Sequence, residues 1–233
     1  MPGALPGRCA STGALYSAAV FATDTWETVS SLATGVGTLV LAVATFSAVR
    51  ATKRSVLVAE EALRSAMRPL VVQSLHTDPV HKALWNDRHT AVVRGGRAVF
   101  EEQNGVIYLA MGLRNVGSGI ALLHAWYVWP DRVFDASADP PDVSEFRRLS
   151  IDLYVASGGS GYWESAVRDP GDPDRAGLLK ALGEREPIRI DLLYGDQQGG
   201  QRTISRFTVL PAGDDGWYCQ VSRHWNVDRP APR

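Results

Sequence analysis

The chain has 233 residues, of which 45% are hydrophobic and 21% are charged, and its formal net charge is −1. These fractions exclude an intrinsically disordered chain, and the near-neutral charge excludes nucleic acid as a partner recognised through bulk electrostatics. The two cysteines, Cys9 and Cys219, lie on opposite sides of the segment that we expect to cross a membrane. A disulfide-stapled domain is therefore excluded as well.

Residues 1–27 are predicted to form a disordered N-terminal tail, and residues 28–49 a transmembrane helix. The second segment has no charged residue, and a helix of that length spans about 33 Å at 1.5 Å per residue. This is enough to cross a hydrocarbon core of about 30 Å, so the lipid bilayer is the expected partner. Two alternatives stay open: a buried helix of a soluble protein, and a signal peptide cleaved near Ala42–Ala44.

The charges on either side of this segment predict its direction in the membrane. Asp24 and Glu27 precede it, whereas Arg50, Lys53 and Arg54 follow it. Basic residues are retained on the cytoplasmic side of membrane helices. We therefore expect a single-pass protein of the inner or plasma membrane, with the N-terminus outside and the C-terminal domain in the cytoplasm.

Residues 50–68 are predicted to form a helical connector, or stalk. Apolar and small residues recur at alternating spacings of four and three: Thr52, Val56, Ala59, Leu63, Ala66 and Leu70. This spacing is that of a coiled coil and predicts a homo-oligomer through the stalk. The alternative is a lone amphipathic helix that packs on its own domain or on the lipid surface. Because the residue before a proline avoids helical conformation, Pro69 ends the helix.

Residues 69–233 are predicted to form one globular domain, because the helical periodicity gives way to the alternation typical of strands. The expected strands are Leu70–Val72, Val106–Leu113, Ile120–Trp129, Leu149–Val155, Ile188–Tyr194, Thr203–Val209 and Trp217–Val221. A hairpin joins the fifth and sixth of these across residues 195–200. Successive strands separated by turn residues favour a mainly β fold, an antiparallel β-sandwich or open barrel behind the N-terminal helix.

One helix is expected inside this domain, at Asp174–Leu182. Asp172 is placed as its N-cap, Pro173 as its first residue and Gly183 just past its end.

Residues 113–121 read Leu-Arg-Asn-Val-Gly-Ser-Gly-Ile-Ala. This resembles the L-x-N-x-G-x-G-x-A turn of uncharacterised bacterial single-pass membrane proteins. In that family, a membrane helix and a basic connector ending in Arg-Pro precede an immunoglobulin-like β-sandwich, so the resemblance implies this architecture over residues 28–222 and implies no activity. The residues themselves indicate that Asn115 bonds the backbone of the turn and that Gly117 and Gly119 take positive φ.

Two glycine-rich segments resemble parts of phosphate-binding loops. Gly117–Gly119 is followed by a predicted strand rather than by a helix, and Gly158–Gly161 lacks the lysine of a phosphate loop. Both are therefore interpreted as structural turns.

A histidine-bearing segment carries metal-ligand residue types, in what we expect to be an exposed loop: His76, Asp78, His81, Asp87 and His89. Their spacing matches no zinc pattern. Cys219 is expected to be a small buried residue of a strand. Asp152, Asp191 and Asp196 are candidate paired acids with no fixed separation. No catalytic, cofactor-binding or metal-ligating residue is therefore assigned.

Tryptophans are unusually frequent, and most are expected to pack in the core or on the sheet: Trp126, Trp129, Trp163, Trp217 and Trp225. The C-terminal segment Ser222–Pro230 combines aromatic, polar and arginine side chains. This composition is typical of interfaces and predicts a surface for a protein partner.

These observations favour a membrane-anchored protein whose cytoplasmic β-sandwich is a binding or scaffold module. The first alternative is a membrane-tethered hydrolase or metal-dependent enzyme near the histidine-bearing segment and Gly158–Gly161. It requires a polar pocket that brings His76 or His81 against an acid. The second alternative is a binding domain on the envelope side of the membrane.

Overall fold

The computed structural model describes residues 12–129, 139–213 and 216–228. Its internal contacts divide the chain into two units, Met1–Glu61 and Ala62–Arg233.

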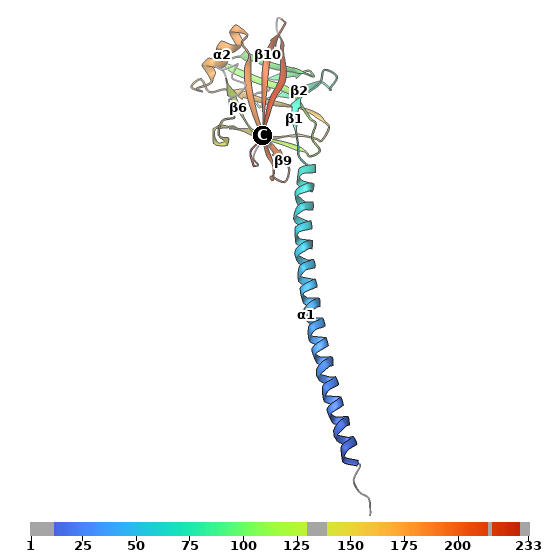
Figure 1. The fold of residues 1–233 in the computed structure, drawn as a ribbon. Helices are drawn as coiled ribbons and strands as arrows, with labels where there is room; N and C mark the ends of the chain where they lie inside the picture. Colours follow the sequence, from blue (N-terminus) through green and yellow to red (C-terminus); the bar gives the residue numbers. More distant parts are fainter. Residues whose placement is uncertain (1–11, 130–138, 214–215, 229–233) are drawn as a thin grey trace, which may run out of the picture. The chain divides into compact units, whose positions relative to one another are not determined.

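The first long element is helix α1, Thr12–Ala66 (Figure 1). The sequence predicts that the helix starts at Thr28, but it starts earlier and includes the second part of the predicted tail. Residues 1–11 lie outside the described residues. The helix is long because no proline interrupts it before Pro69.

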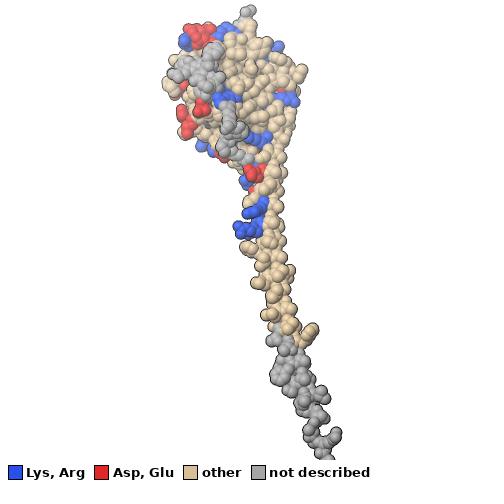
Figure 2. Space-filling view, viewed as in Figure 1, with Lys and Arg blue, Asp and Glu red and all other residues tan. Residues whose placement is uncertain are grey.

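Within α1, the segment Val29–Ala66 is long and apolar enough to cross a membrane. Its large apolar side chains are not covered by the protein; Leu41, for example, is 67% exposed. Figure 2 shows a stretch of this helix without charge, followed by a group of basic side chains. A helix of this composition needs an apolar environment, which a bilayer supplies.

The second unit is built on an antiparallel sheet of nine strands and a separate two-stranded hairpin, β2–β3. The strands of the large sheet are β1 (Val71–Gln73), β4 (Arg97–Gln103), β5 (Val106–Asn115), β6 (Ala121–Trp129), β7 (Arg147–Val155), β8 (Ser160–Val167), β9 (Ile188–Asp196), β10 (Arg202–Ala212) and β11 (Gly216–Asn226). Each strand expected from the sequence is present, and most are longer than expected.

The large sheet curls so that its two ends face each other (Figure 1). One arm runs β7-β6-β9-β10-β11, and β11 continues the sheet into β4, β5 and β8. The link between the arms is short, since β11 pairs with β4 only through Trp217 and Tyr218. The result is mainly antiparallel β with two layers, as expected of a β-sandwich or open barrel.

The main core lies between these two layers. Trp126 of β6 and Trp163 of β8 meet edge to face there, with ring centroids 5.5 Å apart, and Phe207 of β10 is fully buried. Helix α2, Arg175–Glu184, closes one end of the core with Leu178 and Ala181. Burial of such large apolar side chains is the main source of the domain's stability.

The hairpin β2–β3, His81–Leu84 and Thr90–Val93, covers the outer face of β4, β5 and β8. It forms a second apolar cluster with Trp85 packed on Tyr108. The segment that carries the five metal-ligand residue types was expected to be an exposed loop. That prediction is wrong for the part that forms β2.

The structure also corrects the ends of α2. Its N-cap is Asp174, which makes no capping side-chain bond, and its C-cap is Arg185 in the left-handed region at φ 53°. Gly183 therefore lies inside the helix, not just past its end. Asp172 lies before the helix, where its carboxylate accepts from the backbone N–H of Asp174 at 3.0 Å and also holds the side chain of Arg147.

The turn at residues 115–119 is confirmed in one part and corrected in another. Asn115 accepts hydrogen bonds from the backbone N–H groups of Leu70 and Gly117 and donates to the carbonyls of Gly119 and Val155. Neither glycine takes positive φ. Glycine is required because a Cβ at Gly119 would lie 1.8 Å from the carbonyl oxygen of Met67.

Candidate functional site

The five metal-ligand residue types of the histidine-bearing segment have separate partners. His76 lies edge-on to Tyr218, and His81 Nε2 is 3.3 Å from Ser160 Oγ. His89 pairs with Glu101, Asp78 with Arg114, and Asp87 with Tyr108 and Arg168. Over the described ranges, no three His, Cys, Asp or Glu side chains gather as metal ligands, and neither His76 nor His81 meets an acid.

The glycine-rich segment Gly158–Gly161 joins β7 to β8. Gly158 takes φ +68°, a conformation that favours glycine, and the carbonyl of Gly159 accepts from Asn115 N–H. Ser157 donates to the carbonyl of Gly117. The segment therefore locks two turns of the domain together, which is the structural role predicted for it.

The candidate acids lie apart and have different roles. Asp191 is fully buried in a two-pronged ion pair with Arg206, with nitrogen–oxygen distances of 2.7 Å. Asp196 caps the β9–β10 turn by accepting from the N–H groups of Gln198 and Gly200. Asp152 is exposed on β7. Each carboxylate thus has its own environment rather than a shared one.

Cys219 is buried, as predicted, and its thiol lies 3.5 Å from the sulfur of Met111. Burial raises the pKa of the Cys219 thiol, so the reactive thiolate is disfavoured.

The tryptophans predicted to pack do so, and Trp163 is fully buried. In the C-terminal segment, Trp225 is half-buried and lies between two guanidinium groups, those of Arg206 at 4.6 Å and Arg223 at 5.0 Å from its ring centroid. Asp228 pairs with Arg202. The described part of the segment thus lies along β11 and beyond its end.

Two unpaired strand edges lie where the two layers of the domain meet. Strands β7 and β8 are joined by four residues, yet each pairs with a different neighbour: β7 with β6, and β8 with β5. Consecutive antiparallel strands with so short a link usually pair with each other. We name the gap between them the seam.

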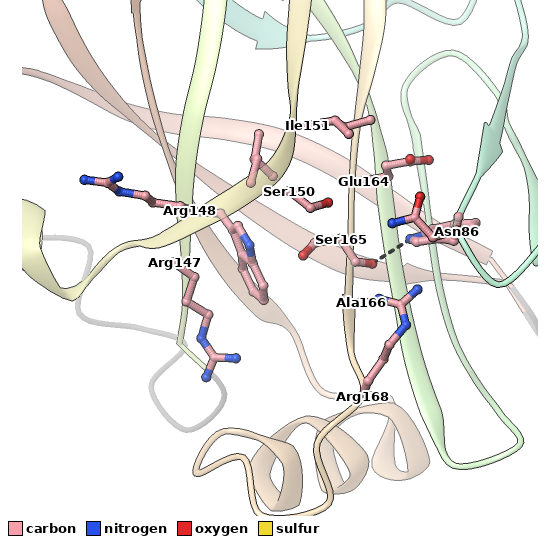
Figure 3. Close-up of a pocket in the computed structure, with 12 residues that line it drawn as sticks. Asn86, Arg147, Arg148, Ser150, Ile151, Glu164, Ser165, Ala166 and Arg168 are labelled. Atoms are coloured by element: carbon pink, nitrogen blue, oxygen red, sulfur yellow. Dashed lines mark hydrogen bonds between the residues drawn. The ribbon is translucent and has the colours of Figure 1, made fainter.

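A cavity of about 250 Å³ lies in the seam (Figure 3). Its lining comes from β7, β8, the β2–β3 turn and the floor of the core: Trp85, Asn86, Trp126, Arg147–Ile151, Glu164–Ala166 and Arg168. Trp85 donates its indole N–H to the carbonyl of Ser165 at 2.9 Å, so part of the free edge of β8 is already occupied. The edge of β7 is the more open of the two.

Charges in the seam are mixed. Arg147 is held by Asp172 and Asp174, and the pKa of Asp172 lies below its usual range because Arg147 stabilises the carboxylate. Burial raises the pKa of Glu164, although Leu84 N–H donates to it. In Figure 3 the side chain of Arg148 points away from the cavity toward solvent. On β7 itself, Arg148 is the exposed charged residue near the start, whereas Asp142 and Glu145, which are exposed just before the strand, are acidic.

A second polar site, which the sequence analysis missed, lies inside the sheet at the end where the chain leaves α1. Tyr194 Oη is 2.8 Å from Ser205 Oγ, which is 2.6 Å from His224 Nδ1. Arg68 donates to Thr203 Oγ1 at 3.1 Å. The sequence does contain a signal for this site. At the inward-facing positions, hydroxyl residues replace apolar residues toward the end of β9 and at the start of β10.

Comparison with known proteins identifies no relative: no family model, no curated protein and no solved structure matches this sequence.

Proposed function

We propose that this protein is a membrane-anchored binding module in which the edge of β7 receives an extended, acidic segment of a partner protein. The observation that carries the proposal is the unpaired edge of β7, a strand of nine residues, beside a cavity in the seam. An exposed strand edge presents N–H and C=O groups that another strand can complete.

The local geometry of β7 supports addition of a strand. Its pairing with β6 shifts register around His124, so that Leu149–Asp152 have one β6 residue opposite them. A bulge of this kind loosens the ladder and re-aims the strand. Ile151 and Tyr154 are 52% and 61% exposed, which leaves apolar surface for a partner strand to cover.

The partner is inferred to be acidic because arginines flank the seam. Arg148 is exposed on the edge strand itself, and Arg168, 46% exposed, lines the cavity. Opposite charges on neighbouring strands contribute about 0.2–1 kcal/mol per pair, and like charges are unfavourable. An acidic strand is therefore preferred over a basic one.

The anchor supports the tethered part of the proposal. The apolar segment of α1 has no cover from the rest of the protein, and three basic residues follow it: Arg50, Lys53 and Arg54. On the positive-inside rule, the β domain faces the cytoplasm. Reporter fusions at the C-terminus are expected to be active in the cytoplasm; activity only on the outer side contradicts this orientation.

The strand-addition test uses the full chain in nanodiscs of neutral phosphatidylcholine. The probes are two fluorescent nine-residue peptides, matched to the length of β7, that alternate valine with glutamate or with lysine. Fluorescence anisotropy measures their binding. The acidic peptide is expected to bind about tenfold more tightly, since several cross-strand charge pairs add.

Charge reversal at the edge provides the control. Arg148→Glu is expected to remove or reverse the preference for the acidic peptide, and Arg94→Glu, on an exposed residue outside the seam, is expected to leave it unchanged. Equal affinity for the two peptides, or a preference that survives Arg148→Glu, would exclude the proposed mode.

A further inference from the structure

The interior of the sheet changes in character along its length. At the α2 end, Ile188 and Val209 are fully buried apolar neighbours. At the opposite end, where the chain enters from α1, the fully buried inward residues are Tyr194, Thr203 and Ser205. Polar groups inside a domain are costly unless they are hydrogen-bonded, so this end is organised around polar contacts.

Arg68 is the cation at this polar end. Its Nη2 donates to Thr203 Oγ1, whereas its Nε is buried and has no hydrogen-bond partner within the described part of the chain. A guanidinium is always charged and carries five N–H donors in a planar fork. A buried, charged donor without an acceptor is strongly unfavourable, and an anion satisfies it.

A cavity of about 220 Å³ lies beside Arg68, and we name it the mouth pocket. It is lined by Arg64, Arg68, Gly200, Gln201, Arg202, Asn226 and Asp228. Three of these residues are arginines and one is an acid. Asp228 is already engaged by Arg202, whose Nη2 lies 2.6 Å from Oδ1 and whose backbone N–H donates to Oδ2. Arg68, whose Nε has no hydrogen-bond partner among the described residues, is therefore the cation through which the pocket would take an anion.

We infer that the mouth pocket binds a phosphate group, with Arg68 as its main ligand. The planar fork of arginine matches phosphate oxygens in two-pronged geometry, and phosphate supplies the negative charge that the Arg68 guanidinium favours. The side-chain amide of Asn226 lines the same pocket and is a further donor. The inference is independent of strand addition at the seam, because the two cavities share no residue.

The position of the pocket suggests two sources of the phosphate. The last turn of α1 belongs to the same unit as the pocket, and Gln201 donates its side-chain amide to the carbonyl of Arg64. The pocket thus adjoins the last turn of α1, and the two sources that the test separates are a phospholipid headgroup and a soluble phosphate compound.

The test uses the full chain in dodecyl maltoside micelles, which contain no phosphate, and inorganic phosphate as the probe, at constant ionic strength. One readout is the thermal unfolding midpoint. The other is the imidazole NMR signal of His224, whose pKa is lowered by burial and by the charge of Arg68. An anion on Arg68 offsets that charge, so phosphate is expected to raise the pKa of His224.

Three variants decide the role of Arg68. Arg68→Gln is expected to weaken phosphate binding by about tenfold or more, since a hydrogen-bonded charge is lost. Arg68→Lys keeps the charge without the fork and is expected to bind with intermediate affinity, which also covers the case in which Arg68→Gln does not fold. Arg94→Gln is the matched exposed control and is expected to bind as the wild type does.

The source is decided by the lipid. Dodecyl maltoside micelles doped with phosphatidic acid are compared with micelles doped with oleic acid to the same surface charge. A His224 shift with phosphatidic acid alone identifies a lipid phosphate, and a shift with free phosphate alone identifies a soluble compound. If neither changes the His224 signal, or if Arg68→Gln binds phosphate like the wild type, the inference is wrong.

Discussion

Gly119 lies where the backbone of the turn approaches the chain that leaves α1. A Cβ there would meet the carbonyl oxygen of Met67 at 1.8 Å, and one at Gly117 would meet the carbonyl oxygen of Arg68 at 2.3 Å. The sequence analysis assigned these glycines to positive φ because local patterns reveal turns. Glycine is required at both positions because the backbone there contacts residues about fifty positions earlier in the chain. No local sequence pattern contains that contact.

Replacing Gly119 with alanine tests this reason. Gly119→Ala is expected to destabilise the domain by about 1–3 kcal/mol or more, since backbone atoms must move to admit the methyl group. Gly183→Ala is the control, because Gly183 lies in a helix with nothing within 4 Å of the added Cβ. Alanine there is expected to be neutral or to stabilise by about 0.5–1 kcal/mol. Urea unfolding of both variants measures the difference; equal effects would refute the explanation.

The buried ion pair between Asp191 and Arg206 is costly to break. Both side chains are at most 1% exposed, and Trp129 also donates to the carboxylate. Asp191→Ala leaves a buried guanidinium without its counter-charge and is expected to cost about 3–5 kcal/mol. The double variant Asp191→Leu with Arg206→Met is expected to be more stable than Asp191→Ala, as denaturant unfolding would show.

Glu164 makes a pH-dependent contribution to the stability of the domain, and its sign is opposite to that of a carboxylate in an ordinary ion pair. Its folded pKa is raised by burial, so ionisation opposes folding once the pH exceeds the unfolded value of about 4.3. Glu164→Gln keeps an acceptor for Leu84 N–H. We expect the variant to be more stable than the wild type at pH 7 and equally stable below about pH 4. Glu184→Gln, at an exposed position of α2, is the control.

At the scale of elements, the strands were predictable and their neighbours were not. Alternation, together with β-branched and aromatic composition, identified seven strands, although β5 and β9 are largely buried on both faces. It missed β4 because Val99 on its outer face is packed under the β2–β3 hairpin, which removes the alternation. The four-residue strands β2 and β3 are too short to show a period. The seam could not be predicted either, because it depends on which strands pair with each other.

Helix α1 offers the clearest test at this scale. Leu41→Arg places a charge in the middle of the uncharged segment. This charge is expected to make the free energy of membrane insertion less favourable by about 2.5–3.5 kcal/mol. Leu57→Arg is the matched control, because Leu57 lies in the same helix beyond the basic residues and is similarly exposed, at 65% against 67%. Extraction of membranes with carbonate is expected to release Leu41→Arg and to retain Leu57→Arg. Release of both or of neither contradicts the assigned span.

Self-association through the stalk stays a prediction.

At the scale of the whole molecule, the sequence specifies an apolar helix followed by a β domain, because both depend on local periodicity. The candidate sites depend on arrangement. The phosphate site needs Arg68 beside strands that begin more than a hundred residues later, and the seam needs two layers that meet without pairing. Local patterns could identify Asn115 as a turn residue, but its bonds to Leu70 and Val155 become visible only in the fold.

The short strand that follows α1 has a mechanical consequence. Between the anchor and the sheet, the chain is fastened by side-chain bonds from Gln201 to Arg64 and from Arg68 to Thr203, by the bonds of Asn115 and Val116 to Leu70, and by the three residues of β1 that pair with β5. Strand β5 in turn pairs with β4 and β8. Tension applied along α1 thus loads the side-chain bonds at Arg64 and Arg68 first and β1 next, and detachment of β1 would release slack in the chain before the other strands of the sheet separate.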